Sequence, residues 1–242
     1  MGLNFAVLVA GASPNGSNIG SHLARAYAAQ GIATFSVSRQ NFESNHGVQS
    51  IACDIASENS LHDLASHLKN QGVQLGGLIN AVGLLHADGL RPEKALSQLK
   101  LQQMQTVFTA NAFAPILLVQ AMLPLLRKDT PTFIASLSAR VGSIADNRLG
   151  GWYSYRAAKA AQNQLFKTLA IELQRSHPLA CCLQLHPGTV DTALSKPFQS
   201  GVASDKLFTA QFSAQALMAV IASKSAADTG TFWAWDGQRV PW

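Results

Sequence analysis

The feature that most constrains this chain is a regular alternation of short apolar runs with longer amphipathic stretches. The apolar runs have the length of buried strands, and there are seven, at residues 5–10, 33–38, 48–53, 76–80, 132–137, 180–186 and 231–235. Helical patterns lie between them, near residues 18–30, 58–70, 98–127, 152–176 and 211–223. This alternation predicts an α/β fold with a parallel sheet covered by helices on both faces.

The length and composition fit one domain of this kind, which we expect to span residues 1–242. The chain is 48% hydrophobic and 13% charged, which excludes disorder. Its net charge of +5 is scattered, so we expect an anionic small-molecule ligand and no nucleic-acid partner. The most apolar stretch, residues 112–126, contains two prolines and is shorter than the ~20 residues of a membrane span. We therefore expect no membrane association.

The three cysteines indicate the compartment. Cys53, Cys181 and Cys182 are an odd set, lie in apolar stretches and lack the spacing of metal ligands. We interpret them as reduced core thiols and expect no metal site. The N-terminus leads into a strand pattern without the charged region of a signal peptide. These features predict a cytoplasmic protein.

A glycine-rich turn at residues 11–20 follows the first strand and opens the first helix. Glycine lets the backbone approach a pyrophosphate, and the helix N-terminus offers free N–H donors and partial positive charge. This position predicts a nucleotide site on a Rossmann-type, doubly wound sheet of about seven strands. Residues 14–16 look like an insertion, so the prediction is centred on Gly11, Ser13, Ile19 and Gly20.

Three residues after the second and third strands are candidates for the adenosine end of the nucleotide. Arg39 stands where an acidic residue would bind the ribose hydroxyls and repel a 2′-phosphate. Its guanidinium instead suits that phosphate, which predicts NADP(H) over NAD(H), although a lone surface arginine is the alternative. Asp54 is placed for the adenine edge with Ile55 beside it, and a helix cap is the other interpretation of Asp54.

Tyr155 and Lys159 are the candidate chemical centre. Their four-residue separation places both on one face of the predicted helix. The reference pKa of tyrosine is ~10, and a nearby ammonium favours the phenolate. We therefore expect Lys159 to lower the pKa of Tyr155. A tyrosine and a lysine at this spacing are also common by chance, so a surface pair is the alternative.

Taken in order, these motifs resemble those of the short-chain dehydrogenase/reductase family over nearly the whole chain. The set is completed by Asn80-Ala81-Val82-Gly83, Asn111, Ser138 and residues 187–192. The resemblance implies that Asn80, Ala81 and Gly83 line the cofactor and steady the sheet, although the family's second Asn is Ala81 here. It implies that Asn111 holds water in a proton relay, and that Pro187, Val190 and Thr192 bound the nicotinamide. Residues 153–161, 186–197 and 235–242 are similar to the C-factor/sniffer-like carbonyl reductase branch.

The family's carbonyl-polarising serine is the main departure. The run Ser138-Ala139-Arg140-Val141-Gly142 places Ala139 at the strict motif position. Ser138 is our candidate, if the strand end twists or bulges to aim it inward. Ser143 is the alternative, and loss of the serine remains open.

The resemblance implies an NADP(H)-dependent enzyme that reduces an aldehyde, ketone or quinone. Tyr155 would donate the proton, Lys159 would hold the ribose, and Ser138 would steady the oxyanion. The alternative is a nucleotide-binding signalling or regulatory protein with little turnover. An apolar substrate wall, or ordinary packing, is expected of Leu149, Trp152, Tyr153, Leu194 and Phe198. Apolar residues on several helix faces predict a homodimer or homotetramer: Phe108, Phe113, Leu117, Leu165, Phe166 and Leu169.

Overall fold

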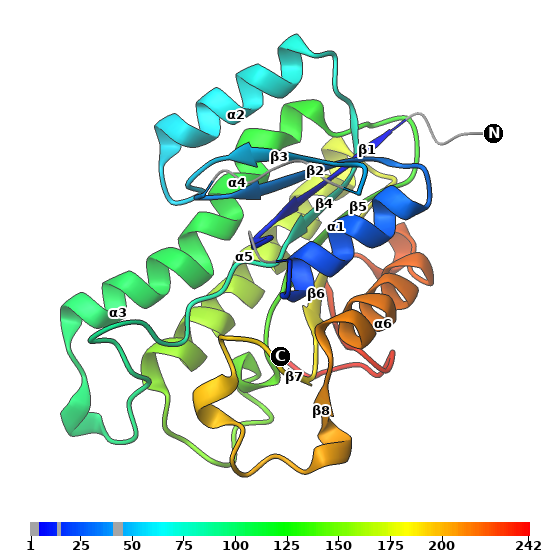
Figure 1. Cartoon of the computed structure of the whole chain (residues 1–242). Coiled ribbons are helices and arrows are strands. Elements are labelled where there is room, and N and C mark those ends of the chain that lie inside the picture. Colours follow the sequence, from blue (N-terminus) through cyan, green and yellow to red (C-terminus); the bar gives the residue numbers. More distant parts are fainter. Residues whose placement is uncertain (1–4, 14–15, 41–45) are drawn as a thin grey trace.

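Seven parallel strands form the central sheet of the computed structural model, which describes residues 5–13, 16–40 and 46–242. Their order across the sheet is β3-β2-β1-β4-β5-β6-β9 (Figure 1). The strands are β1 (Ala6–Ala10), β2 (Ala33–Ser38), β3 (Val48–Ala52), β4 (Leu75–Asn80), β5 (Thr132–Leu137), β6 (Ala180–His186) and β9 (Thr231–Ala234). Each corresponds to one of the seven predicted runs, and the predicted fold class is confirmed.

Helices cover both faces of this sheet (Figure 1). The helices are α1 (Ile19–Ala29), α2 (Glu58–Asn70), α3 (Leu101–Phe108), α4 (Ala114–Met122), α5 (Tyr153–Ser176) and α6 (Ala210–Ala222). Helices α1 and α6 pack together on one face, and α2, α4 and α5 cover the other. Strands β7 (Thr189–Val190) and β8 (Leu207–Phe208) pair outside the main sheet, in the region after β6.

Alternate residues of each central strand enter different cores. In β1, Val7 and Val9 pack beneath α1 and α6, while Leu8 packs on the side of α2, α4 and α5. All three are 0% exposed, as expected for strands that are buried on both faces. This period of two also governs which way the polar residues at the strand ends point.

The helical pattern predicted near residues 98–127 forms one continuous segment, and its apolar part is longer than the run of residues 112–126 that we judged too short for a membrane span. Helix α3, a π-helical turn (Thr109–Phe113) and α4 follow one another, and residues Leu101–Leu125 are long and apolar enough to cross a membrane by length and composition. Within its most apolar window 44% is buried inside the structure. Leu118 and Met122 are 0% and 1% exposed against the sheet, as in a core helix.

Candidate active site

The turn between β1 and α1 brings two glycines into positions that no larger residue can take. Gly11 has a φ of +96°, and a Cβ atom on it would lie 2.7 Å from the backbone carbon of Ala81. A Cβ atom on Gly20 would lie 2.6 Å from the carbonyl oxygen of Gly11. Ile19 begins α1 and packs against the core. The N-terminus of α1 therefore lies directly against the turn, as a pyrophosphate site requires.

Side chains of α1 hold the rest of this turn. The Oδ1 atom of Asn18 accepts a hydrogen bond from the backbone N–H of Ser21 (2.9 Å), and its Nδ2 donates to the carbonyl of Gly11 (2.8 Å). The backbone N–H of Ser13 donates to the Ser21 hydroxyl (2.9 Å). The four predicted turn residues thus lie together. Residues 14–15 of the apparent insertion lie outside the described residues.

Arg39 and Asp54 follow two paired strands, β2 and β3, at the same edge of the sheet. The Arg39 side chain is exposed and makes no hydrogen bond or ion pair with any residue that the structure describes. Asp54 is also exposed, and its Oδ1 accepts from the backbone N–H of Ala56 (3.0 Å) in the turn before α2. The N-cap of α2 is Ser57, so the interpretation of Asp54 as a helix cap is wrong. Ile55 is buried in the core.

Asn80, at the end of β4, joins two strands of the sheet. Its side chain is 1% exposed, and its Nδ2 donates to the hydroxyl of Ser136 on β5 (2.8 Å). Its Oδ1 accepts from the backbone N–H of Val82 (3.3 Å). Asn80 therefore links β4 to β5 and to the loop that follows β4. Because the family's second Asn is replaced by Ala81 here, Asn80 makes these links by itself.

Asn111 lies in the π-helical turn and is 0% exposed. Its amide exchanges two hydrogen bonds with the backbone of Leu84, at 3.0 and 2.7 Å. Pro115, four residues later, has no N–H to donate to the Asn111 carbonyl. A Cβ atom on Gly83 would lie 3.6 Å from Oδ1 of Asn111 and 4.0 Å from Nζ of Lys159. The predicted Gly83, Asn111 and Lys159 thus meet at one point.

Tyr155 and Lys159 lie on one face of α5, and both are buried, at 6% and 2% exposed. The Lys159 Nζ donates to the carbonyl of Leu137 and to Oε1 of Gln162, each at 2.8 Å. It lies 5.9 Å from the centre of the Tyr155 ring. This burial excludes the alternative of a surface pair.

Burial also shifts the pKa values of both groups. It lowers the pKa of Lys159 to about 7 and raises the pKa of Tyr155 above its ordinary value. The expected lowering of the Tyr155 pKa is therefore absent in the chain by itself, because burial disfavours the phenolate. At neutral pH the phenol keeps its proton, as a proton donor must.

The expected inward orientation of Ser138 is wrong. Strand β5 pairs with β6 without a bulge, so Ser136 and Ser138 point to the same side, toward α5. The Ser138 hydroxyl donates to Oδ1 of Asn163 on α5 (2.6 Å) and is buried there. Ala139, and not Ser138, packs in the apolar cluster that contains Tyr155.

Ser143 does not take that place either. Its side chain is 1% exposed, and its hydroxyl accepts from the backbone N–H of Asp146 (3.1 Å), which stabilises the loop after β5. Of the three possibilities for the carbonyl-polarising serine, the geometry fits the one in which Ala139 occupies the site.

An apolar cluster surrounds Tyr155, and three loops contribute to it. Three of the five expected wall residues belong to it: Trp152, Leu194 and Phe198. Leu149 and Tyr153 do not, since they are 92% and 41% exposed. The loop after β6 also carries the predicted Pro187, Val190 and Thr192, with Val190 buried in β7.

Sequence reasoning missed two buried polar residues, Gln162 and Glu93. Gln162 is 0% exposed, bonds to Lys159, and its Nε2 donates to Ser136 (2.6 Å) and Gln184 (3.1 Å). Its position three residues after Lys159, on the same helix face, was the available signal. Glu93 accepts hydrogen bonds at the start of α5, and no pattern in the sequence marked it.

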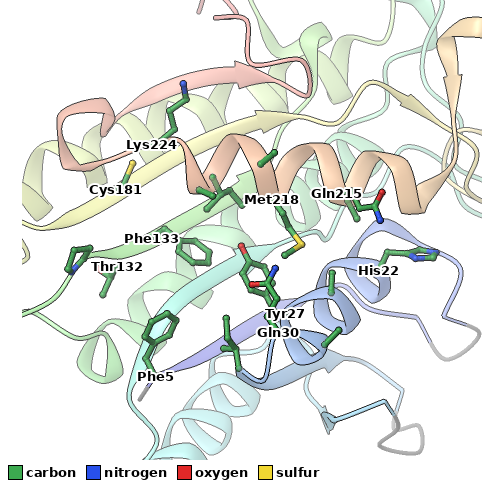
Figure 2. Close-up of a pocket in the computed structure, with 18 of the residues that line it drawn as sticks. Phe5, His22, Tyr27, Gln30, Thr132, Phe133, Cys181, Gln215, Met218 and Lys224 are labelled. Atoms are coloured by element: carbon green, nitrogen blue, oxygen red, sulfur yellow. The ribbon is translucent and has the colours of Figure 1, made fainter. Parts of the chain in front are cut away.

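A large cavity lies elsewhere, between α1, α6 and the amino ends of the strands (Figure 2). It measures about 1410 Å³, and its lining includes Tyr27, Phe133 and Met218. Tyr155 and Lys159 lie at the opposite, carboxyl end of the sheet and do not line it. The size of a cavity therefore does not locate the chemistry of this protein.

The fold, the glycine turn and the buried tyrosine–lysine pair together define a nucleotide-dependent oxidoreductase. The model of the short chain dehydrogenase family matches residues 6–203. The chain belongs to the short-chain dehydrogenase/reductase family and is an NAD(P)-dependent oxidoreductase.

Three individual proteins show what this chain is similar to. The C-signal protein of Myxococcus xanthus is 34% identical over 148 residues, which cover 61% of this chain and 84% of that protein. The NADPH-bound carbonyl reductase from chicken fatty liver has a TM-score of 0.82 at 25% identity and covers 98% of both chains. The Sniffer carbonyl reductase of D. melanogaster has a TM-score of 0.84 at 22% identity, covers 99% of this chain and 100% of its own, and shares the fold.

Proposed function

We propose that this chain reduces the carbonyl group of an aldehyde, ketone or quinone to an alcohol, with NADP(H) preferred over NAD(H). The observation that carries the proposal is the burial of Tyr155 with its proton retained, beside Lys159 and within an apolar cluster. A buried, protonated phenol at the end of a nucleotide site suits proton transfer to a substrate oxygen.

The residues present fit a dinucleotide. The closely packed Gly11 and Gly20 leave no room for a Cβ atom beside the N-terminus of α1, which suits a pyrophosphate. Arg39, an exposed cation without a partner among the described residues, supports the preference for NADP(H), because a guanidinium suits a 2′-phosphate. When bound, the dihydronicotinamide supplies a hydride to the carbonyl carbon.

The chain's own residues handle the proton and the charge. Tyr155 hydrogen-bonds the carbonyl oxygen and gives up its proton as negative charge develops there. Lys159 carries its positive charge below a pH of about 7 and stabilises the phenolate that remains. Since Ala139 supplies no hydroxyl, Tyr155 polarises the carbonyl without help from a serine.

The test is turnover with NADPH of a panel of aldehydes, ketones and quinones, by the parent and by Tyr155→Phe. We expect the variant to lose turnover by at least a thousandfold while its affinity for NADPH stays within threefold, because the phenol mainly serves the chemistry. A variant that keeps a tenth or more of the parental turnover would show that another group donates the proton.

One observation favours a second candidate, a nucleotide-binding signalling or regulatory protein. Ala139 lacks the hydroxyl of the carbonyl-polarising serine. Removal of one such preorganised donor typically lowers turnover by about 10²–10³-fold. The name of the relative C-signal also points to signalling. A parent that binds NADPH yet reduces nothing in the panel would favour this candidate.

We also propose a homodimer or homotetramer and a cytoplasmic location. Of the six apolar residues that suggested assembly, Phe113 is 49% exposed, while Phe166 and Leu169 are buried in the chain's own core. Leu101 and Ile171, 72% and 51% exposed, add to the apolar surface of α3 and α5. The proposal of a cytoplasmic location rests on the three cysteines, which are buried free thiols, as is usual in a reducing compartment.

A further inference from the structure

The residue that precedes α5, Trp152, has a left-handed backbone, with φ 51° and ψ 43°. Among the described residues, one other non-glycine residue has a positive φ, His46, which lies in an exposed turn. This conformation costs an ordinary L-residue about 1–3 kcal/mol and persists where surrounding contacts impose it. Such residues gather at functional sites, so the contacts of Trp152 bear on its role.

Glu93 fixes this conformation. The backbone N–H of Trp152 donates to the Glu93 carbonyl (2.5 Å). The Glu93 carboxylate, 3% exposed, accepts from the backbone N–H (3.2 Å) and the hydroxyl of Ser154. It thus occupies the first turn of α5, where the helix dipole favours negative charge.

Arg156 braces the segment from the other side. Its Nε donates to the carbonyl of Gly151 (3.0 Å), and its Nη1 donates to the carbonyl of Val141 (3.2 Å). The backbone on both sides of Trp152 is thereby tied to α5 and to the loop after β5. The backbone conformation at Trp152 is therefore built into the fold.

The indole is held against the catalytic tyrosine. Its ring meets Tyr155 edge to face, with centroids 6.3 Å apart and planes at 76°, and meets Phe198 at 5.1 Å and 63°. Phe198 also contacts the ring of His86 (5.7 Å), whose Nε2 lies 3.0 Å from the Ala193 carbonyl. Trp152 and Phe198, from two loops, thus pack in the cluster of Tyr155, and His86 from a third loop packs on Phe198.

Trp152 is incompletely buried, and its indole N–H finds no acceptor among the described residues. The indole N–H is not among the buried polar atoms that lack a partner, so it is open to solvent. An indole with an accessible donor beside the phenol of Tyr155 is suited to contact a substrate and not only to fill the core.

We propose that Trp152 is a specificity-determining residue that selects flat, aromatic carbonyl substrates over saturated ones of the same skeleton, and that Glu93 is its positioning residue. The inference rests on the proposed function. An aromatic ring can stack or meet edge to face with Trp152 and Phe198, which a saturated ring of the same size cannot do. Each such contact is worth about 0.5–1.5 kcal/mol beyond area burial, or about 2- to 10-fold in kcat/KM.

The test compares acetophenone with 1-cyclohexylethanone, which share a carbon skeleton and differ in the aromaticity of the ring. Their intrinsic reactivities cancel when the ratio of their kcat/KM values is compared between variants. We expect Trp152→Gly to lower the aryl-to-cyclohexyl ratio of kcat/KM at least fivefold. Glycine suits the left-handed backbone, so this variant should fold. Trp152→Phe should retain most of the preference.

Tyr153→Ala is the matched control, since it removes the adjacent aromatic side chain that lies outside the cluster; its ratio should equal that of the parent. Glu93→Gln tests the positioning role. We expect a higher KM for acetophenone, which lowers the aryl preference, and an unchanged KM for the cyclohexyl ketone. A role of Glu93 in stability alone would change both substrates equally and would overturn its assignment.

The outcomes separate the inference from the proposed function. A parental ratio retained in Trp152→Gly overturns the inference and leaves the proposed reduction intact. If the parent reduces neither ketone, the inference is tested by calorimetric titration of acetophenone into the protein with NADP⁺ bound. Binding that Trp152→Gly weakens at least fivefold supports the aromatic wall and rejects the reduction of these ketones. Binding that the substitution does not change, or no binding, overturns the inference.

Discussion

Gln162 gives the most direct test of how the buried ammonium of Lys159 is held. Its Oε1 is one of two oxygens that accept hydrogen bonds from the Lys159 ammonium, each at 2.8 Å, the other being the carbonyl of Leu137. The substitution Gln162→Leu keeps a side chain of similar size and removes that acceptor. A hydrogen bond to a charged group contributes about 1.5–3 kcal/mol, which corresponds to about one to two pH units in a protonation equilibrium.

The sign of the effect follows from the burial of Lys159. Burial already lowers the pKa of Lys159 to about 7, and loss of an acceptor favours the neutral amine further. In the proposed reduction the charged ammonium stabilises the phenolate of Tyr155, so we expect activity to fall as pH rises through the pKa of Lys159. We expect the upper limb of the profile of kcat/KM against pH to move to lower pH by about one unit or more.

The assay is NADPH oxidation between pH 5 and 9 at subsaturating substrate. Gln164→Leu is the matched control, because this glutamine lies on the same helix, is exposed and bonds to Thr168; its profile should match the parent. Gln162→Glu should move the limb to higher pH, because a carboxylate stabilises the ammonium. If the profiles of Gln162→Leu and the parent superimpose, Gln162 does not control the charge of Lys159 and this reasoning fails.

Three further predictions concern other parts of the molecule. NADPH should bind at least tenfold tighter than NADH in fluorescence titrations, and Arg39→Ala should remove most of that gap; equal parental affinities would refute the assignment. Ser138→Ala should cost about 1–3 kcal/mol in urea unfolding, because it leaves Asn163 without its donor, yet lower turnover less than tenfold; a hundredfold loss would restore Ser138 as the polarising group. Without nucleotide, the free energy of unfolding should rise by up to about 2 kcal/mol from pH 7 to 8.5, because the unfolded state binds the proton that buried Lys159 has released. Lys159→Met should remove that slope, and a slope that persists in this variant would assign it to another group.

The architecture could be predicted from the sequence, and so could the group of residues that lie together at the candidate site, whose roles stay predictions. Strands and helices are read from local periodicity, which is written along the chain, and seven alternating runs became the seven strands of one sheet. The glycine turn, Asn111 and the Tyr155–Lys159 pair are likewise fixed by their order and spacing. Parallel strands bring their carboxyl ends to one edge, so residues that are distant in the sequence had to converge there.

The orientation of individual side chains was decided by tertiary structure. Ser138 and Ala139 are adjacent, and the period of two in an unbulged β5 turns one toward Asn163 and leaves the other beside Tyr155. A bulge of one residue would have exchanged them, and composition does not show where a strand bulges.

Burial was decided in the same way. Phe166 and Phe113 are equally apolar in the sequence, yet packing against the sheet buries the first and leaves half of the second exposed. Gln162 and Glu93 are ordinary surface residues by composition. They became structural because the interior around α5 offered them Lys159 and Ser154 as partners. A buried polar group is stable only when such partners are present, and they come from segments that the sequence keeps far apart.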